Sequence, residues 1–157
     1  MGRDIYETRF FDLSLRAVSD EHNAKIKVFT DKRVLEMDAQ VSFDTEYAGV
    51  SSLDHFLGGL LGGVLLALLE QARHKHVCIE DLEGRLTAKL ANPLNLLRVQ
   101  GYDQAPDLQD LRIVVYVYAE MGEDALFRFC QEALALSPLY NCVKRTLGLL
   151  VDVKRLL

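Results

Sequence analysis

Polar and apolar residues alternate most regularly in residues 35–43, LEMDAQVSF. A period of two places one row of side chains in a core and the other row in water, which is typical of a half-buried strand. Looser alternation predicts two earlier strands, in residues 5–16 and 24–29. The short segment 30–33 separates the second strand from the third, so we expect these two strands to form a hairpin.

The longest apolar segment runs from Leu53 to His74 and contains no proline. Residues 56–69 have no polar side chain, and these 14 residues are fewer than the roughly 20 that a membrane-spanning helix needs. Length and the absence of proline favour a buried helix over a strand. Ser51 or Ser52 is placed to cap its N-terminus.

Four of the ten glycines lie in this helix, at positions 58, 59, 62 and 63. Together they cost roughly 3–4 kcal/mol relative to alanine in a helix interior. Their spacing places them in one stripe along the helix. The stripe predicts that another helix, a partner subunit or a ligand comes close to the helix backbone.

Two strands follow, at residues 84–90 and 111–119. The second is rich in β-branched and aromatic residues and is expected to be central in a sheet. Residues 93–107 connect them, a length at which a loop often forms a lid or carries a short helix.

Two consecutive helices and a final strand complete the chain. The first helix starts after Gly122, and the second starts at Ser137-Pro138, where serine is a preferred cap and proline a preferred first residue. Gly148 ends the second helix, and the last strand covers residues 149–153. The order β-β-β-α-β-β-α-α-β predicts an α+β fold in a single domain, residues 1–157.

Composition excludes several function classes. The net charge of −5 argues against a nucleic-acid-binding protein and against an anionic membrane surface as a partner. The N-terminal residues have no apolar stretch of signal-peptide length, so we expect a cytoplasmic protein.

The candidate metal and thiol residues form no recognisable motif. Cys78, Cys130 and Cys142 are widely spaced and fit neither a zinc site nor a disulfide framework, so we interpret them as small buried hydrophobic residues. His74 and His76 could share a face on an extended segment, but the end of a helix favours surface cations there. We therefore expect no metal site and no cofactor.

Two short segments resemble the OsmC/Ohr family, thiol-dependent organic hydroperoxide reductases and their relatives. Residues 51–63, SSLDHFLGGLLGG, are similar to the start of the family's central helix, and residues 137–141, SPLYN, are similar to its Cys-Pro-Val-x-Asn segment. The resemblance implies an OsmC-like fold. It also implies an intertwined homodimer whose central helices pack together and whose active sites lie at the subunit interface.

The family's chemistry depends on two cysteines: one attacks the peroxide as a thiolate, and the other resolves the resulting sulfenic acid. Gly63 and Ser137 stand at these two positions. Leu53 stands at the position of the family glutamate, with Asp54 next to it, and Arg33 is a candidate for the family arginine. The resemblance therefore implies that the nucleophile, the resolving group and that carboxylate are all missing from this chain.

Three hypotheses for function follow. The first is an OsmC-like homodimer without thiol peroxidase activity that binds a small hydrophobic ligand at the dimer interface. The second is an organic hydroperoxide reductase that uses a displaced cysteine. The third is a purely structural or protein-interaction homodimer. The candidate pocket residues are Asp54, His55, Gly59, Gly63 and Ser137, and the candidate displaced cysteines are Cys78, Cys130 and Cys142.

Overall fold

The computed structural model describes residues 9–157, which belong to two compact units. The first unit extends to Phe56, and the second covers Leu57–Leu157. The long helix α1, Ser52–Lys75, begins in the first unit and continues into the second. A single domain over residues 1–157 stays a prediction.

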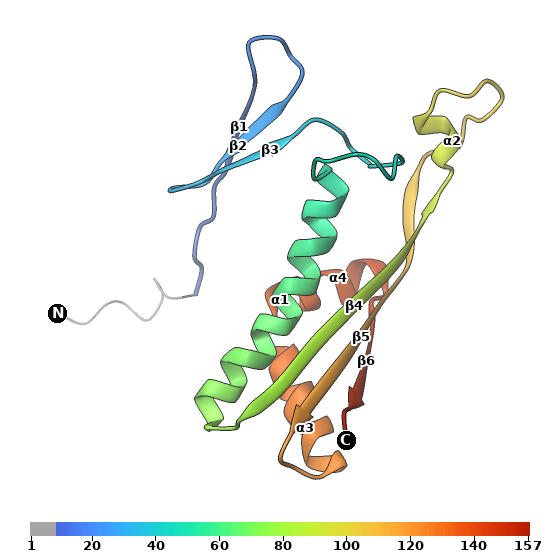
Figure 1. The fold of residues 1–157 in the computed structure, drawn as a ribbon. Coiled ribbons are helices and arrows are strands. Elements are labelled where there is room, and N and C mark those ends of the chain that lie inside the picture. The colour runs from blue at the N-terminus through green and yellow to red at the C-terminus, as the bar shows by residue number, and fades with distance from the viewer. Residues whose placement is uncertain (1–8) are drawn as a thin grey trace. The chain divides into compact units, whose positions relative to one another are not determined.

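The first unit contains a three-stranded antiparallel sheet in the order β1-β2-β3, shown in blue and cyan in Figure 1. Its strands are Arg16–Ser19, Ile26–Phe29 and Val34–Met37. Thr30 N–H donates to the Arg33 carbonyl at 2.9 Å and closes the turn between β2 and β3. The expected hairpin is therefore confirmed.

Two strand predictions in this unit need correction. The first strand was expected in residues 5–16, of which 5–8 lie outside the described residues. Residues 9–15 form no strand, and β1 begins only at Arg16. The third strand was expected over residues 35–43 but ends at Met37, which pairs with Ile26, the first residue of β2. A strand needs a hydrogen-bonding neighbour, and β2 offers none beyond that pair.

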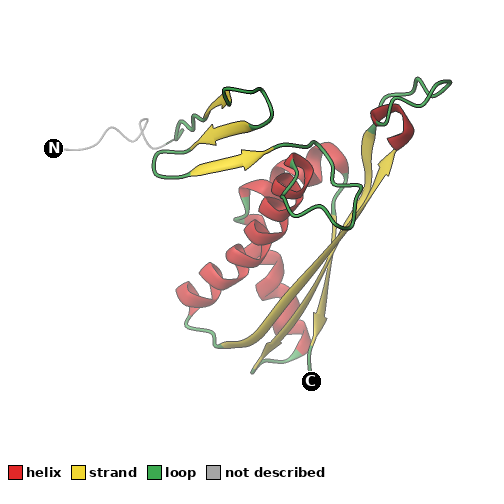
Figure 2. Cartoon of the chain, turned by 45° about the horizontal axis from the view of Figure 1, so that its top comes forward, coloured by secondary structure: helices red, strands yellow, loops and turns green. Residues whose placement is uncertain are grey.

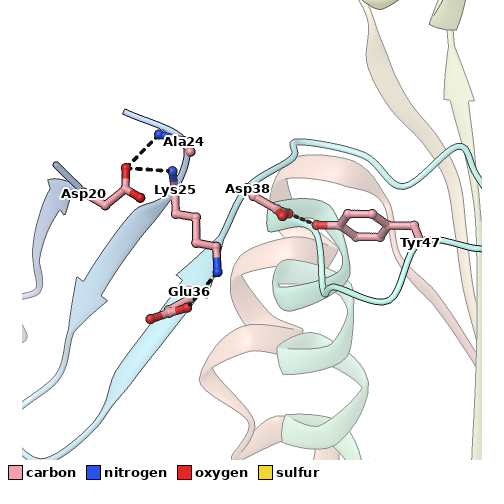
Figure 3. Close-up of polar contacts among 6 residues, drawn as sticks. All are labelled: Asp20, Ala24, Lys25, Glu36, Asp38 and Tyr47. Atoms are coloured by element: carbon pink, nitrogen blue, oxygen red, sulfur yellow. Dashed lines mark hydrogen bonds and ion pairs between the residues drawn. The ribbon is translucent and has the colours of Figure 1, made fainter. Parts of the chain in front are cut away.

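Asp20 explains why β2 starts so late. Its Oδ1 accepts hydrogen bonds from the backbone N–H groups of Ala24 and Lys25, at 2.7 and 3.2 Å. Figure 3 shows both bonds. They also lower the pKa of the Asp20 carboxyl, since they favour its charged form.

The apolar face of the first sheet is not buried as the alternation predicted. No apolar side chain among residues 9–50 is buried, and Leu35 and Phe43 are 36% and 49% exposed. Within this unit no second layer packs on the sheet, so the alternating pattern identifies a face that lacks a cover.

The second unit contains the sheet β4-β5-β6, in which β4 and β5 are antiparallel and β6 runs parallel to β5. The strands are Ile79–Ala91, Asp107–Ala119 and Leu150–Arg155. The first two contain the segments predicted as strands and extend beyond them. The connection between them carries a short helix, α2, Pro93–Leu96, as expected.

Helices α1, α3 (Glu123–Ala135) and α4 (Pro138–Leu147) cover one face of this sheet, as Figure 2 shows. β5 is central, as predicted, and its inward side chains alternate strictly with half-exposed ones. The core comprises Leu111, Ile113, Val115 and Val117 of β5, Leu60, Val64 and Leu68 of α1, and Leu126, Phe129, Cys130 and Ala133 of α3. The α+β fold and its element order are confirmed.

Helix α1 comes very close to the sheet at Gly84 of β4. A Cβ there would lie 2.9 Å from Leu61 Cδ1 and 3.1 Å from the methyl groups of Leu65. The missing side chain lets α1 lie directly on the strand. Gly84 was expected only as one residue of an alternating strand.

α1 is the one helix in the described part of the chain that is long and apolar enough to cross a membrane, judged by length and composition. Its 24 residues exceed the 14 of the uninterrupted apolar run. One face of the helix forms part of the protein core through Leu60, Val64 and Leu68. Only 22% of its most apolar window is buried, so much of its apolar surface has no cover.

Candidate functional site

The N-terminus of α1 is capped reciprocally by Ser51 and Asp54. Ser51 Oγ accepts from Asp54 N–H at 3.1 Å, and the Asp54 carboxylate accepts from Ser51 N–H at 3.0 Å and from Ser51 Oγ at 2.8 Å. This is the capping-box arrangement with aspartate as the acid. The predicted cap is therefore Ser51, and Asp54 has a structural partner in the same turn.

The next two candidates flank this cap. Leu53 N–H donates to the Gln40 carbonyl at 3.1 Å, so this position serves the loop and offers no carboxylate. His55 is partly buried, and its Nε2 is the one buried side-chain nitrogen or oxygen without a hydrogen-bond partner among residues 9–157. His55 thus carries an unused polar atom beside the cap.

The middle of α1 meets the start of α4 at Gly63. A Cβ at Gly63 would lie 3.1 Å from Leu139 Cδ1, and the three atoms nearest to it all belong to Leu139. Leu139 follows Ser137 by two residues in the chain. The structure therefore brings together the two segments that carry Gly63 and Ser137, and a leucine side chain occupies the space beside Gly63.

Ser137 is the N-cap of α4, as predicted. It is 1% exposed, and its Oγ accepts a hydrogen bond from Tyr140 N–H at 3.2 Å. The chain turns into the helix at Pro138 and leaves it at Gly148, whose φ of 67° lies in the left-handed region that glycine adopts readily. The Ser137 hydroxyl therefore stabilises the helix end.

The glycine stripe of α1 divides into two parts. Gly63 faces Leu139 of the same chain, whereas a Cβ at Gly58, Gly59 or Gly62 would meet nothing within 4 Å. Close packing was expected along the whole stripe. Among the described residues of this chain, a close neighbour of the stripe is present at Gly63 alone.

The three cysteines lie in different surroundings and are all free. Cys130 is 1% exposed, and burial raises the pKa of its thiol from 9.0 to about 11. Cys78 and Cys142 are exposed, which corrects the expectation that all three are buried. A buried thiol that keeps its proton at neutral pH is a poor nucleophile, so Cys130 is the least suited of the three to peroxide chemistry.

The remaining candidates lie at the surface. His74 and His76 are exposed at the C-terminal end of α1, which confirms the expected surface location. Among residues 9–157 no group of three His, Cys, Asp or Glu side chains could hold a metal ion. Arg33 is exposed in the turn between β2 and β3, where its backbone N–H donates to Thr30 Oγ1 at 2.9 Å.

The chain matches known proteins in its three-dimensional structure and not in its sequence. No protein-family profile and no curated protein sequence matches the chain. An OsmC-like protein from Mycoplasma pneumoniae superimposes with a TM-score of 0.69 at 18% identity, covering 93% of this chain and 96% of that one.

Two further solved structures agree. The organic hydroperoxide resistance protein OhrB of Bacillus subtilis has a TM-score of 0.62 at 15% identity, covering 92% of this chain and 98% of that one. An organic hydroperoxide resistance protein OsmC from Legionella pneumophila has a TM-score of 0.62 at 12% identity, with 94% and 99% covered. The chain therefore has the OsmC/Ohr fold, and the resemblance seen in residues 51–63 and 137–141 is confirmed at the level of the fold.

Proposed function

We propose that this OsmC-fold chain forms a homodimer that does not reduce hydroperoxides through the family's two thiols and that binds a small hydrophobic ligand at its subunit interface. The contact between Gly63 and Leu139 carries the first part of this proposal. At the two positions where the family has cysteines, one residue has no side chain and faces a leucine methyl group, and the other uses its hydroxyl as a helix cap.

The dimer is supported by apolar surface that no part of the described chain covers. A three-stranded sheet needs a hydrophobic face packed on another layer, yet no apolar side chain in residues 9–50 is buried. α1 adds Phe56, Leu66 and Leu69, which are 45%, 52% and 37% exposed. Apolar surface of this extent marks an interaction site, and a second copy is the partner that the fold itself suggests.

The ligand is supported by the open part of the glycine stripe. A Cβ added at any of these three glycines (58, 59 and 62) would meet no atom within 4 Å apart from the neighbouring helix backbone, and the exposed Phe56 and Leu66 of α1 are apolar. Paired across a dimer interface, two such surfaces would enclose an apolar cavity, and such cavities favour apolar ligands. The structural homodimer remains the alternative if the partner's helix fills this space completely.

A peroxidase assay tests the chemistry. Purified protein is mixed with cumene hydroperoxide and dithiothreitol, and the loss of peroxide is followed against a protein-free control. We expect no acceleration. The second candidate function, reduction through a displaced thiol, is favoured by the exposed free Cys78 and Cys142. Turnover that disappears in a Cys78→Ser or Cys142→Ser variant would establish that candidate and overturn the proposal.

Sedimentation and a binding titration test the rest. We expect a species of twice 17.7 kDa, whereas a monomer at micromolar concentration contradicts the dimer. An apolar fluorescent probe such as anilinonaphthalene sulfonate should bind saturably, and Gly59→Leu should weaken its binding. Thr146→Leu adds an equal apolar side chain on exposed α4 and serves as the control. Equal binding to both variants would exclude the glycine stripe as the ligand site.

A further inference from the structure

The tip of the β4–β5 hairpin exposes a cluster of large apolar side chains. It lies at the end of two 13-residue strands, away from the turn that leads to α3 (Figure 1). Four apolar residues within nine positions are exposed there: Leu94 36%, Leu97 53%, Val99 41% and Tyr102 52%. Single exposed leucines are ordinary, but a cluster at the end of a projecting arm indicates a contact surface.

This hairpin tip is internally braced. The side-chain amides of Asn92 and Asn95 donate to the carbonyls of Ala105 and Gln104, both at 2.9 Å. Val99 N–H donates to the Leu94 carbonyl at 3.1 Å. These bonds fix the loop with its apolar side chains outward, so docking it would cost little conformational entropy.

The first unit contains a matching groove of about 400 Å³. It lies at the open end of the β2–β3 hairpin, where Ile26 pairs with Met37. Its lining is mainly apolar and comprises Asn23, Ala24, Lys25, Ile26, Met37, Asp38, Ala39, Gln40 and Ser52. The groove thus lies beside the sheet whose apolar face has no cover.

The charges of the two surfaces are complementary. Lys25 pairs with Glu36 at 3.5 Å, whereas Asp38 accepts a hydrogen bond from the hydroxyl of Tyr47, as Figure 3 shows. Asp38 has no cationic partner among residues 9–157. Arg98, next to Leu97 on the tip, likewise has no acidic partner in that part of the chain.

We infer that the hairpin tip of one subunit inserts Leu97 into the first-unit groove of a second copy, with Arg98 facing Asp38. This inference rests on the proposed homodimer and names the surfaces that hold it together. In a two-fold symmetric dimer the contact forms twice, because each chain carries both the tip and the groove. It gives the uncovered sheet an apolar partner and removes four exposed hydrophobic side chains from water.

Thiol crosslinking tests this contact. In a background of Cys78→Ser and Cys142→Ser, one chain carries Ala24→Cys and a differently tagged chain carries Leu97→Cys. The two are co-expressed and treated with a short thiol crosslinker. We expect a covalent product that contains both tags. Lys32→Cys in place of Ala24→Cys is the control, since it lies in the closed turn at the other end of the hairpin, and it should give little product.

The outcomes separate this inference from the dimer itself. A dimer in sedimentation without an Ala24→Cys to Leu97→Cys product overturns the contact and leaves the dimer standing. A monomer overturns both. Efficient crosslinking within a single chain that carries both cysteines, with none between chains, also overturns the contact.

Charge reversal provides an independent test. Arg98→Glu should weaken dimerisation about 25-fold, because each of the two symmetric contacts loses about fivefold, the upper end for an exposed ion pair. Adding Asp38→Arg to the same chain should restore the affinity, because the pair is then reversed at both ends. Equal weakening by the single and the double variant would contradict the pairing of Arg98 with Asp38.

Discussion

Replacing the three open glycines of α1 by alanine should have opposite effects depending on what covers the helix. In the chain by itself, a Cβ at Gly58, Gly59 or Gly62 meets nothing within 4 Å, so the substitutions are free of steric cost. Each removes a helix penalty of about 0.8–1 kcal/mol, so the triple variant would gain about 2.5–3 kcal/mol. For a chain of this length that gain raises the Tm by roughly 5–12 °C.

The alternative, a structural homodimer in which the partner's helix fills the space above the stripe, reverses this sign. If the partner's helix packs against the stripe, each added methyl group overpacks the interface at a cost of about 1–3 kcal/mol. In that case Gly58→Ala/Gly59→Ala/Gly62→Ala lowers the Tm and weakens dimerisation in sedimentation equilibrium. The proposed cavity leaves room for the three methyl groups, so we expect the higher Tm and unchanged dimerisation. Gly63→Ala is the matched control, because its methyl group meets only Leu139, which is 42% exposed and can move aside. A triple variant with a lower Tm and weaker association would refute the open cavity and would establish that the partner's helix packs closely on this stripe.

Three further predictions follow from the described contacts. Ser51→Ala and Ser137→Ala each remove a helix cap and should lower the free energy of unfolding by about 1 kcal/mol in urea titrations. Ser137→Thr keeps a hydroxyl and should retain most of this stability. An unchanged free energy of unfolding in an alanine variant would show that the serine hydroxyl does not cap the helix. The pKa of Cys130 is raised from 9.0 to about 11 in the folded state, so its contribution to stability is present below pH 9 and is lost as the pH rises toward 11. The fall in Tm over this range should be smaller in Cys130→Ala, and equal falls would contradict the effect of burial on the thiol. The double variant Gly63→Cys/Ser137→Cys should gain little hydroperoxide turnover, because Leu139 Cδ1 lies 3.1 Å from the Cβ position of residue 63. Adding Leu139→Ala should raise the turnover. A fully active double variant would show that Leu139 is no obstacle.

The features that local sequence dictates were predictable. The ends of α4 follow from serine before proline and from glycine in a left-handed conformation, both effects of one or two residues. The element order followed from the same kind of local signal. Period-two alternation located β2 and β3 but overestimated the length of β3, because that length depends on how far β2 extends as a neighbour. Asp20 sets this limit by bonding two backbone N–H groups, and alternation carries no sign of it.

The candidate site required knowledge of packing. The resemblance predicts that Gly63 and Ser137 stand at the family's cysteine positions, but the sequence could not show that Leu139 is the residue that faces Gly63. It also missed the special role of Gly84, because a glycine in an alternating strand resembles any other small residue until a helix is seen to lie on it. Cys78 and Cys142 were misjudged for a similar reason, since their exposure, like the correctly expected burial of Cys130, depends on long-range contacts.

The contacts at Gly63 and Ser137 show how the junction of α1 and α4 is stabilised in this chain. A serine at the start of α4 supplies a capping oxygen, which stabilises the helix by about 1 kcal/mol. Glycine at position 63 allows α4 to bring Leu139 against the backbone of α1, so the space beside it is occupied by a packed side chain. Both residues therefore serve the junction of α1 and α4 directly. A junction stabilised by a cap and a leucine places no demand on a thiol, in a chain that shares the OsmC/Ohr fold with solved structures at 12–18% identity.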